Sequence, residues 1–271
     1  MLVRDLGDHF QVVLQPDHAD LSGQIAARWG RVSSLSADVQ SALECAAARH
    51  DEGWAVWERH PRLDDEGRPQ IFFGVPLDSL LSSYQACVDV LAAENRGAAL
   101  LVSMHVSGLQ RNRYGLMDET EVTPLAELRP AIREFVEHEE QRQAQLIGEL
   151  GFDERERWLA YRQLQVYDVF SLYLGLADLA KGEDTTIAAP PARLRSSDDH
   201  EAVRSLRISP SPEPWTVWCE PFPFTEEPTR LVMRRRLLVK KTWPSEDSFR
   251  ADLRSAPVED VTIYARGSAT P

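Results

Sequence analysis

The chain has 271 residues, of which 43% are hydrophobic, an ordinary proportion for a globular protein with a sizeable core. Its formal net charge of -13 at pH 7 argues against nucleic acid or an anionic membrane as partners, because phosphate groups attract basic surfaces. Three widely spaced cysteines without a CxxC motif predict neither a disulfide framework nor a thiolate zinc site. No segment approaches the roughly 18 to 20 apolar residues that span a bilayer. We therefore expect a cytoplasmic protein.

Two helices are predicted in the N-terminal part of the chain. The first covers residues 17–29, between a proline and a glycine that favour its two ends, and His18 lies on its apolar face. The second covers residues 36–53, begins at a serine that can cap it, and carries His50 and Asp51 in its last turn. Adjacent residues on a helix point about 100° apart. These two side chains can therefore reach one ion only if the ion lies over the flank of the helix between them.

Four further amphipathic helices are predicted, over residues 76–93, 97–109, 124–150 and about 153–180. His105 in the second of these helices aligns with apolar neighbours and faces inward. His138 in the third lies at the edge of the apolar stripe. Asp168 in the fourth occupies the middle of an otherwise apolar row, which is an unfavourable place for an unpaired carboxylate.

The composition changes near Lys181, where a polar connector that contains prolines begins. Short β-prone runs follow at residues 203–208, 215–220, 231–240 and 258–264, and they predict a small antiparallel sheet. The predicted fold is therefore mainly α, with a helical core in residues 1–182 and a β-rich C-terminal portion in residues 183–271, α+β overall. The β-rich portion is expected to pack on the core, and the two can form one integrated domain.

The inward-facing ionisable groups predict a metal site. Burying a carboxylate or an imidazole without a partner costs on the order of several kcal/mol, whereas a divalent cation takes up the lone pairs. His18, His50, Asp51 and Asp168 can all be placed on apolar faces of the predicted helices. Imidazole and carboxylate ligands together suit a divalent transition metal, Fe, Mn, Zn, Co or Ni, better than Ca.

The order of these residues resembles the ligand order of the HD-domain superfamily of metal-dependent phosphohydrolases. It is carried by DHADLSG with His18, by AARHDEGW with His50 and Asp51, and by QVYDVFSLY with Asp168. The similarity covers roughly residues 10–180 and is to a divergent bacterial branch with no established activity. It implies an HD-like helical core in which these four residues bind the metal.

The resemblance also implies a second metal in some members. Certain branches of the superfamily place additional histidines between the His-Asp pair and the last aspartate. His105 and His138 lie in that interval of this sequence, and His105 is the better candidate for a fifth ligand. We therefore expect one or two ions.

The expected reaction is hydrolysis of a small molecule, phosphorylated in the simplest case, by a water that the metal activates. Asp51 and Glu52 are the predicted catalytic residues, and Glu58 is an alternative for moving the proton, since the spacing selects neither glutamate. Two other functions stay open, a catalytically silent metal-binding or ligand-binding regulatory module and an HD-like di-iron oxygenase. The sequence is also compatible with a homodimer.

Each candidate has a purely structural alternative. His18 can bond a backbone group at the start of its helix, and Asp168 can pair with an arginine or cap a neighbouring helix. His105 can be a core histidine with satisfied hydrogen bonds, and His138 a surface residue. Trp54 and Trp57 follow the His-Asp pair and can lie in the core or form the wall of a pocket. The basic residues Arg234, Arg235, Arg236, Lys240 and Lys241 are expected on a solvated strand face.

Overall fold

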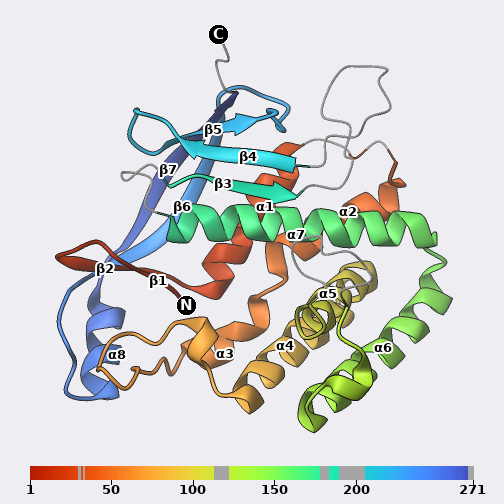
Figure 1. Ribbon diagram of the computed structural model, residues 1–271, viewed down its shortest axis with the longest axis horizontal. Helices are drawn as coiled ribbons and strands as arrows, with labels where there is room; N and C mark the ends of the chain where they lie inside the picture. The colour runs from red at the N-terminus through yellow and green to blue at the C-terminus, as the bar shows by residue number, and fades with distance from the viewer. Residues whose placement is uncertain (30–31, 33, 113–121, 178–182, 189–204, 268–271) are drawn as a thin grey trace.

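The computed structural model describes residues 1–29, 32, 34–112, 122–177, 183–188 and 205–267 (Figure 1). Its main helices are α1 (Gln15–Trp29), α2 (Ala37–Arg49), α3 (Ala55–Glu58), α4 (Leu77–Ala92), α5 (Arg96–Leu109), α6 (Pro130–Leu150), α7 (Glu154–Leu176) and α8 (Glu246–Ser255). Three short 3-10 turns are η1 (Glu52–Trp54), η2 (Phe72–Gly74) and η4 (Leu125–Glu127). None of the described helices combines the length and apolar composition needed to cross a membrane.

The strands are β1 (Leu2–Asp5), β2 (His9–Val13), β3 (Thr185–Ala188), β4 (Ser205–Pro210), β5 (Thr216–Glu220), β6 (Thr229–Val239) and β7 (Val258–Gly267). They form one 7-stranded sheet in the order β1-β2-β6-β7-β5-β4-β3. Neighbouring strands are antiparallel except β5 and β7, which are parallel. The sheet therefore combines strands from both ends of the chain.

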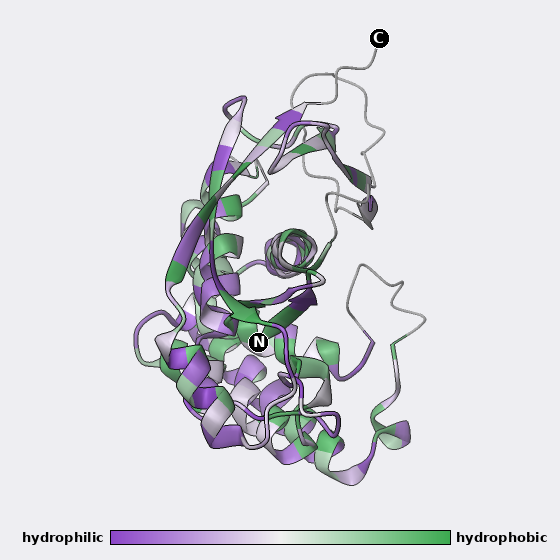
Figure 2. Cartoon of the chain, turned by 90° about the vertical axis from the view of Figure 1, so that its left-hand side faces the viewer, coloured by the Kyte–Doolittle hydropathy of each residue, from purple (hydrophilic) through white to green (hydrophobic). Residues whose placement is uncertain are grey.

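The sheet curls around α7. This helix contacts both edge strands, β1 and β3, and Figure 2 shows the sheet bending past the helix that is seen end-on. The Gln11 side-chain amide in β2 donates to the backbone oxygen of Gly175 in α7, at 2.9 Å. At Gly175 an added Cβ would lie 2.8 Å from Leu2 Cδ1, so the glycine leaves room for the Leu2 side chain against α7. Helices α1, α2 and α5 pack against α7, and α2 also contacts both α1 and α5. Helix α1 also packs on β6, where the Gln24 side chain bonds the backbone of Val232.

The predicted fold class is wrong in its sheet. The sheet is mixed, and it includes two N-terminal strands that the sequence analysis did not predict, so the protein is not mainly helical with a small antiparallel C-terminal portion. Strand β2 is buried on both faces, with Phe10 and Val12 against α8 and with Gln11 and Val13 toward α7. Burial on both faces removes the alternation of polar and apolar residues that identifies a half-buried strand.

Helix α5 forms the centre of the helical layer. All of its residues from Gly97 to Gly108 are buried, which matches their small and apolar side chains. The helix begins at Asn95, whose side-chain oxygen accepts a hydrogen bond from the backbone N–H of Ala98 at 2.9 Å. It contacts α2, α4, α6 and α7, so a polar side chain on α5 faces protein on every side.

Candidate metal centre

The five predicted metal ligands come from four helices that meet below the sheet. His18 lies in the second turn of α1, His50 caps the end of α2 and Asp51 follows it, His105 lies in α5, and Asp168 lies in α7. All are buried, with exposed fractions of 1% for His18, 0% for His50, 7% for Asp51, 2% for His105 and 5% for Asp168. The helices therefore bring together residues that are up to 150 positions apart in the chain.

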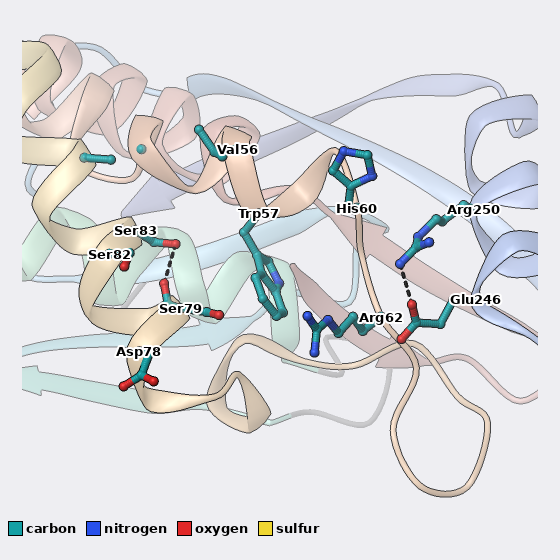
Figure 3. A pocket seen from close by; sticks show the side chains of 12 residues that line it. Val56, Trp57, His60, Arg62, Asp78, Ser79, Ser82, Ser83, Glu246 and Arg250 are labelled. Carbon is teal, nitrogen blue, oxygen red and sulfur yellow. Dashed lines mark hydrogen bonds and ion pairs between the residues drawn. The ribbon is translucent and has the colours of Figure 1, made fainter.

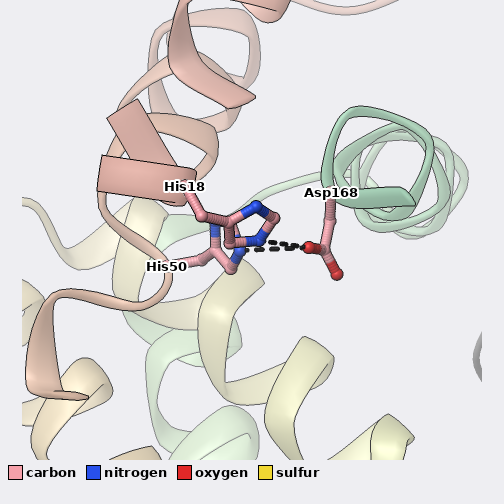
Figure 4. Close-up of side chains that lie close together, drawn as sticks. All are labelled: His18, His50 and Asp168. Atoms are coloured by element: carbon pink, nitrogen blue, oxygen red, sulfur yellow. Dashed lines mark hydrogen bonds and ion pairs between the residues drawn. The ribbon is translucent and has the colours of Figure 1, made fainter. Parts of the chain in front are cut away.

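Asp168 is the common neighbour of the three histidines. Its Oδ1 lies 2.8 Å from His18 Nε2 and 3.3 Å from His50 Nε2 (Figure 4), and its Oδ2 lies 3.5 Å from His105 Nε2. Asp51 Oδ2 lies 3.8 Å from His18 Nε2 and 3.7 Å from His50 Nε2. One ligand atom each from His18, His50 and Asp168 falls within 4.8 Å of the other two, a spacing that suits a shared metal ion.

The outer hydrogen bonds of two histidines fix which ring nitrogen carries the lone pair. His50 Nδ1 lies 3.0 Å from the backbone oxygen of Ala47, which only accepts, so Nδ1 carries the proton. Ser171 Oγ donates to the backbone oxygen of Asp168 at 2.9 Å and therefore accepts from His18 Nδ1 at 3.0 Å. Whenever the two rings are neutral, Nε2 is therefore an acceptor, and it faces the Asp168 carboxylate.

This arrangement fits a cation. Two acceptor nitrogens and one carboxylate oxygen converge in a buried place, and His50 Nε2 has no hydrogen bond of good geometry. A proton on one imidazole satisfies one of the contacts, whereas a divalent ion satisfies all of them at once. The second nitrogen of each ring donates to a protein oxygen, which is the usual way in which proteins orient histidine ligands.

The charges in the cluster shift the pKa values in opposite directions. Burial disfavours the charged form of His50, but the carboxylates of Asp51 and Asp168 outweigh burial and raise the pKa of His50 to about 9. Burial also opposes ionisation of Asp168, yet the close contacts with His18 and His50 hold its pKa well below the ordinary value. Burial lowers the pKa of His105 to about 4, so this ring is neutral at pH 7 and available as a ligand.

Neither glutamate considered for proton transfer lies in the cluster. Glu52 is partly exposed and forms an ion pair with Arg49, so the geometry does not support its predicted catalytic role. Glu58 is buried, but its carboxylate binds the Met1 amino group at 2.6 Å and accepts from the backbone N–H of Gln15. Of the two predicted catalytic residues, Asp51 lies in the cluster and Glu52 does not.

Two residues outside the predicted set, Gln15 and Ser171, support the cluster. Gln15 Nε2 donates to Asp51 Oδ2 at 3.0 Å and so orients that carboxylate. Ser171 orients His18, as described above. Both lie three positions from a predicted ligand on the same helix, Gln15 before His18 and Ser171 after Asp168, which is the spacing of neighbours on a helix face. This spacing from a predicted ligand is the sequence feature that could have identified both residues.

A glycine fixes the position of the His-Asp pair against α4. A Cβ at Gly53 would lie 2.3 Å from the backbone N of Cys87 and 2.5 Å from the backbone oxygen of Ser83. Because these are backbone atoms of a helix, they cannot move aside for a side chain. The glycine therefore lets the turn after Asp51 rest directly on α4.

A cavity of about 300 Å³ opens beside the cluster. His18, Asp51, His105 and Asp168 form one side of it, while His50 is fully buried behind them. The rest of the wall is largely apolar and comes from Phe72, Phe73, Leu80, Tyr84, Leu109 and Leu172. Four of the five predicted ligands therefore line this cavity.

A second cavity, of about 640 Å³, lies on another face of α4 and away from the cluster (Figure 3). Trp57 lines it, with the Arg62 guanidinium 4.9 Å from its ring centre, and Arg250 pairs with Glu246 at its edge. Trp54, by contrast, is fully buried in the core against Tyr84. Of the two tryptophans considered as pocket walls, Trp57 lines a pocket, but not the one at the cluster.

The other candidates lie elsewhere. His138 on α6 is exposed and within hydrogen-bond distance of Arg142, so it is not part of the cluster. Arg234 on β6 is exposed and pairs with Asp17, as expected of a solvated strand face. Arg235 differs from this prediction, because its side chain is mostly buried, donates to Gln11 and pairs with Glu259.

Comparison with protein families found a match over most of the chain. The family described as "Protein of unknown function (DUF3891)" matches residues 1–240, a range that includes all five predicted ligands and most of the sheet. Comparison with curated proteins gave no match, and neither did comparison with solved structures.

Proposed function

Because the chain belongs to the DUF3891 family, whose function is unknown, we propose its activity from its site: a metal-dependent hydrolase that acts on a small molecule. The observation that carries the proposal is the convergence of His18 Nε2 and His50 Nε2, which are acceptors when the rings are neutral, on one oxygen of Asp168. The resemblance to the HD-domain superfamily, and with it phosphohydrolase-like chemistry, stays a prediction that this proposal adopts.

In the proposed function His18, His50 and Asp168 hold a divalent transition metal, Fe, Mn, Zn, Co or Ni. Asp168 Oδ2 faces His105, which allows that histidine to bind the same ion or a second one. A metal in this position supplies Lewis-acid chemistry, since it lowers the pKa of water and polarises the bond to be hydrolysed. Ser171 and the Ala47 carbonyl keep the ring nitrogens oriented.

We propose Asp51 as the residue that accepts the proton of the attacking water. Asp51 and Asp168 are the carboxylates among the described residues of the cavity wall, and Asp168 already faces three histidines. Burial raises the pKa of Asp51, which makes it a better base than an exposed aspartate. The Gln15 side-chain amide donates a hydrogen bond to Asp51 Oδ2 and so orients this carboxylate.

The test measures metal binding first and turnover second. Protein loaded with Zn²⁺, Mn²⁺ or Fe²⁺ and then dialysed should retain about one or two ions per chain by mass spectrometry. Asp168→Asn should weaken metal binding by about 100-fold or more, since even residues outside the ligand shell contribute about 10-fold to 100-fold. Asp65→Asn, at an exposed aspartate, is the matched control and should bind metal normally. Equal metal binding by the two variants would refute the metal centre.

A binding module without turnover is a second candidate, favoured by the positions of the two glutamates. Glu52 is turned to the surface and Glu58 is engaged by the Met1 amino group, so Asp51 alone is left as a base. Wild-type protein that retains metal but hydrolyses no substrate in a broad panel of phosphate and carboxylate esters would support this candidate over the hydrolase.

A further inference from the structure

The cavity beside the metal centre combines an ionisable floor with an apolar wall. Phe72 and Phe73 come from η2, Leu80 and Tyr84 from α4, and Leu172 from α7. Its volume, about 300 Å³, is at the small end of the range of about 300 to 1,000 Å³ that is usual for ligand pockets. A cavity of this size and lining fits a single ring or a short alkyl chain.

Packing within the fold does not account for the apolar side chain of Phe73. Its side chain is 76% exposed, although it stands next to Phe72 with ring centres 3.9 Å apart. An exposed phenyl ring contributes little to folding stability, because burial from water is what stabilises the folded state. Phe73 lines the cavity, so an apolar group of a bound molecule would bury its ring.

The charges of the wall favour a substrate of low charge. A divalent ion and the carboxylates of Asp51 and Asp168 sum to zero when the histidines are neutral. Among the described residues that line the cavity there is no lysine or arginine, and the polar side chains beyond the ligands are Gln15, Gln110 and the hydroxyl of Tyr84. A dianion would keep its charge uncompensated beside an apolar wall, which is costly.

We propose that the substrate is a small apolar ester that carries at most one negative charge and packs its ring or alkyl chain against Phe73 and Leu172. This inference rests on the proposed function and narrows its substrate class. In the reaction one O–H bond of water and the ester bond break. The acid fragment takes the hydroxyl and the alcohol fragment takes the hydrogen, so no redox partner is needed. Phosphate monoesters, which are dianions near pH 8, fit the cavity less well.

Binding of unreactive probes to metal-loaded protein tests the inference without relying on turnover. Isothermal titration calorimetry at pH 8 compares acetate, benzoate and phenylphosphonate. Benzoate should bind at least about 10-fold more tightly than acetate because its ring reaches the apolar wall. Phenylphosphonate, which has the same ring and a second negative charge, should bind no more tightly than benzoate.

Three variants separate the apolar and the charge contributions. Phe73→Ser should weaken benzoate binding several-fold and leave acetate binding unchanged. Val56→Ser, at an exposed apolar residue of the other cavity, is the control and should change neither. Gln110→Arg adds the missing positive charge and should tighten phenylphosphonate binding by about 10-fold or more.

The outcomes distinguish this inference from the proposed function. Metal-loaded protein that binds acetate and benzoate equally, or phenylphosphonate more tightly than benzoate, overturns the substrate class and leaves the metal centre standing. Protein that takes up no metal overturns the hydrolase and this inference together.

Discussion

The two cavities on either side of α4 contain similar residue types in different settings. At the candidate metal centre three imidazoles and two carboxylates are at most 7% exposed, and their ligand atoms face one another. In the other cavity Arg250 and Glu246 neutralise each other at the surface, and water can satisfy whatever they leave open. Exposed charges are thus satisfied by each other and by water, whereas buried acceptors that face one another favour a bound cation.

The largest effect on stability is expected where Gly53 packs against α4, the helix between the two cavities. Gly53→Ala places a methyl group 2.3 Å from a backbone atom of α4, so the turn that carries His50 and Asp51 has to move. We expect a loss of about 3 kcal/mol or more in the free energy of unfolding, measured by urea denaturation. Metal affinity should fall as well, because the two ligands shift.

Gly148→Ala on the exposed side of α6 is the matched control for that substitution. No atom lies within 4 Å of a Cβ built there, and the residue is helical. Alanine should therefore stabilise the protein by up to about 1 kcal/mol. A similar loss of stability in both variants would contradict this prediction, because it would show that the close packing of Gly53 on α4 is not the cause of the loss.

The buried cluster predicts a pH dependence for metal-free protein. The pKa of His50 is raised to about 9 from its ordinary value of 6.5, so its stabilising contribution is complete below pH 6.5 and is lost as the pH rises toward 9. The free energy of unfolding should fall by up to about 1.4 kcal/mol per pH unit between pH 7 and 8.5. The low pKa of His105 has the opposite sense, since its contribution is lost as the pH falls from 6.5 toward 4.

Urea denaturation with a chelator at pH 6.5, 7.5 and 8.5 measures this slope. His50→Gln should flatten it, and bound metal should remove it because the ion replaces the proton as the partner of the carboxylates. An unchanged slope in His50→Gln would assign the titration to another group and weaken the account of the cluster.

The smallest effect is expected at the surface next to the cluster. Glu52→Gln removes an exposed ion pair with Arg49, which contributes at most about 1 kcal/mol. Metal binding and turnover should stay within about twofold of wild type, as measured by mass spectrometry and ester hydrolysis. A loss of turnover with normal metal content would restore Glu52 to the catalytic role that its sequence position suggests.

The positions of the candidate ligands could be predicted from helical phase. His18, His105 and Asp168 each lie on an apolar helix face, and the structure brings these faces together. Glu52 could not be excluded this way, because α2 ends at Arg49 and the following turn, not the helix, sets its direction. Whether the cluster binds a metal is a separate question, which the metal measurements answer.

The sheet was harder to predict because its partners are distant in sequence. The four expected C-terminal strands occur with small shifts, as β4 to β7. Strands β1 and β2 were missed, since β2 is buried on both faces and its partner β6 begins more than 200 residues later. The parallel pairing of β5 with β7 likewise depends on α8 and the chain between them, and the alternation within either strand does not specify it.

The pairing of β2 with β6 links the metal centre to the order in which the chain is made. Strand β2 leads into α1, which carries His18, and its partner is residues 229–239. During synthesis the first ligand is therefore present long before the strand that anchors its helix. Such long-range pairing slows folding, so we expect the candidate centre to assemble only after β6 has been synthesised.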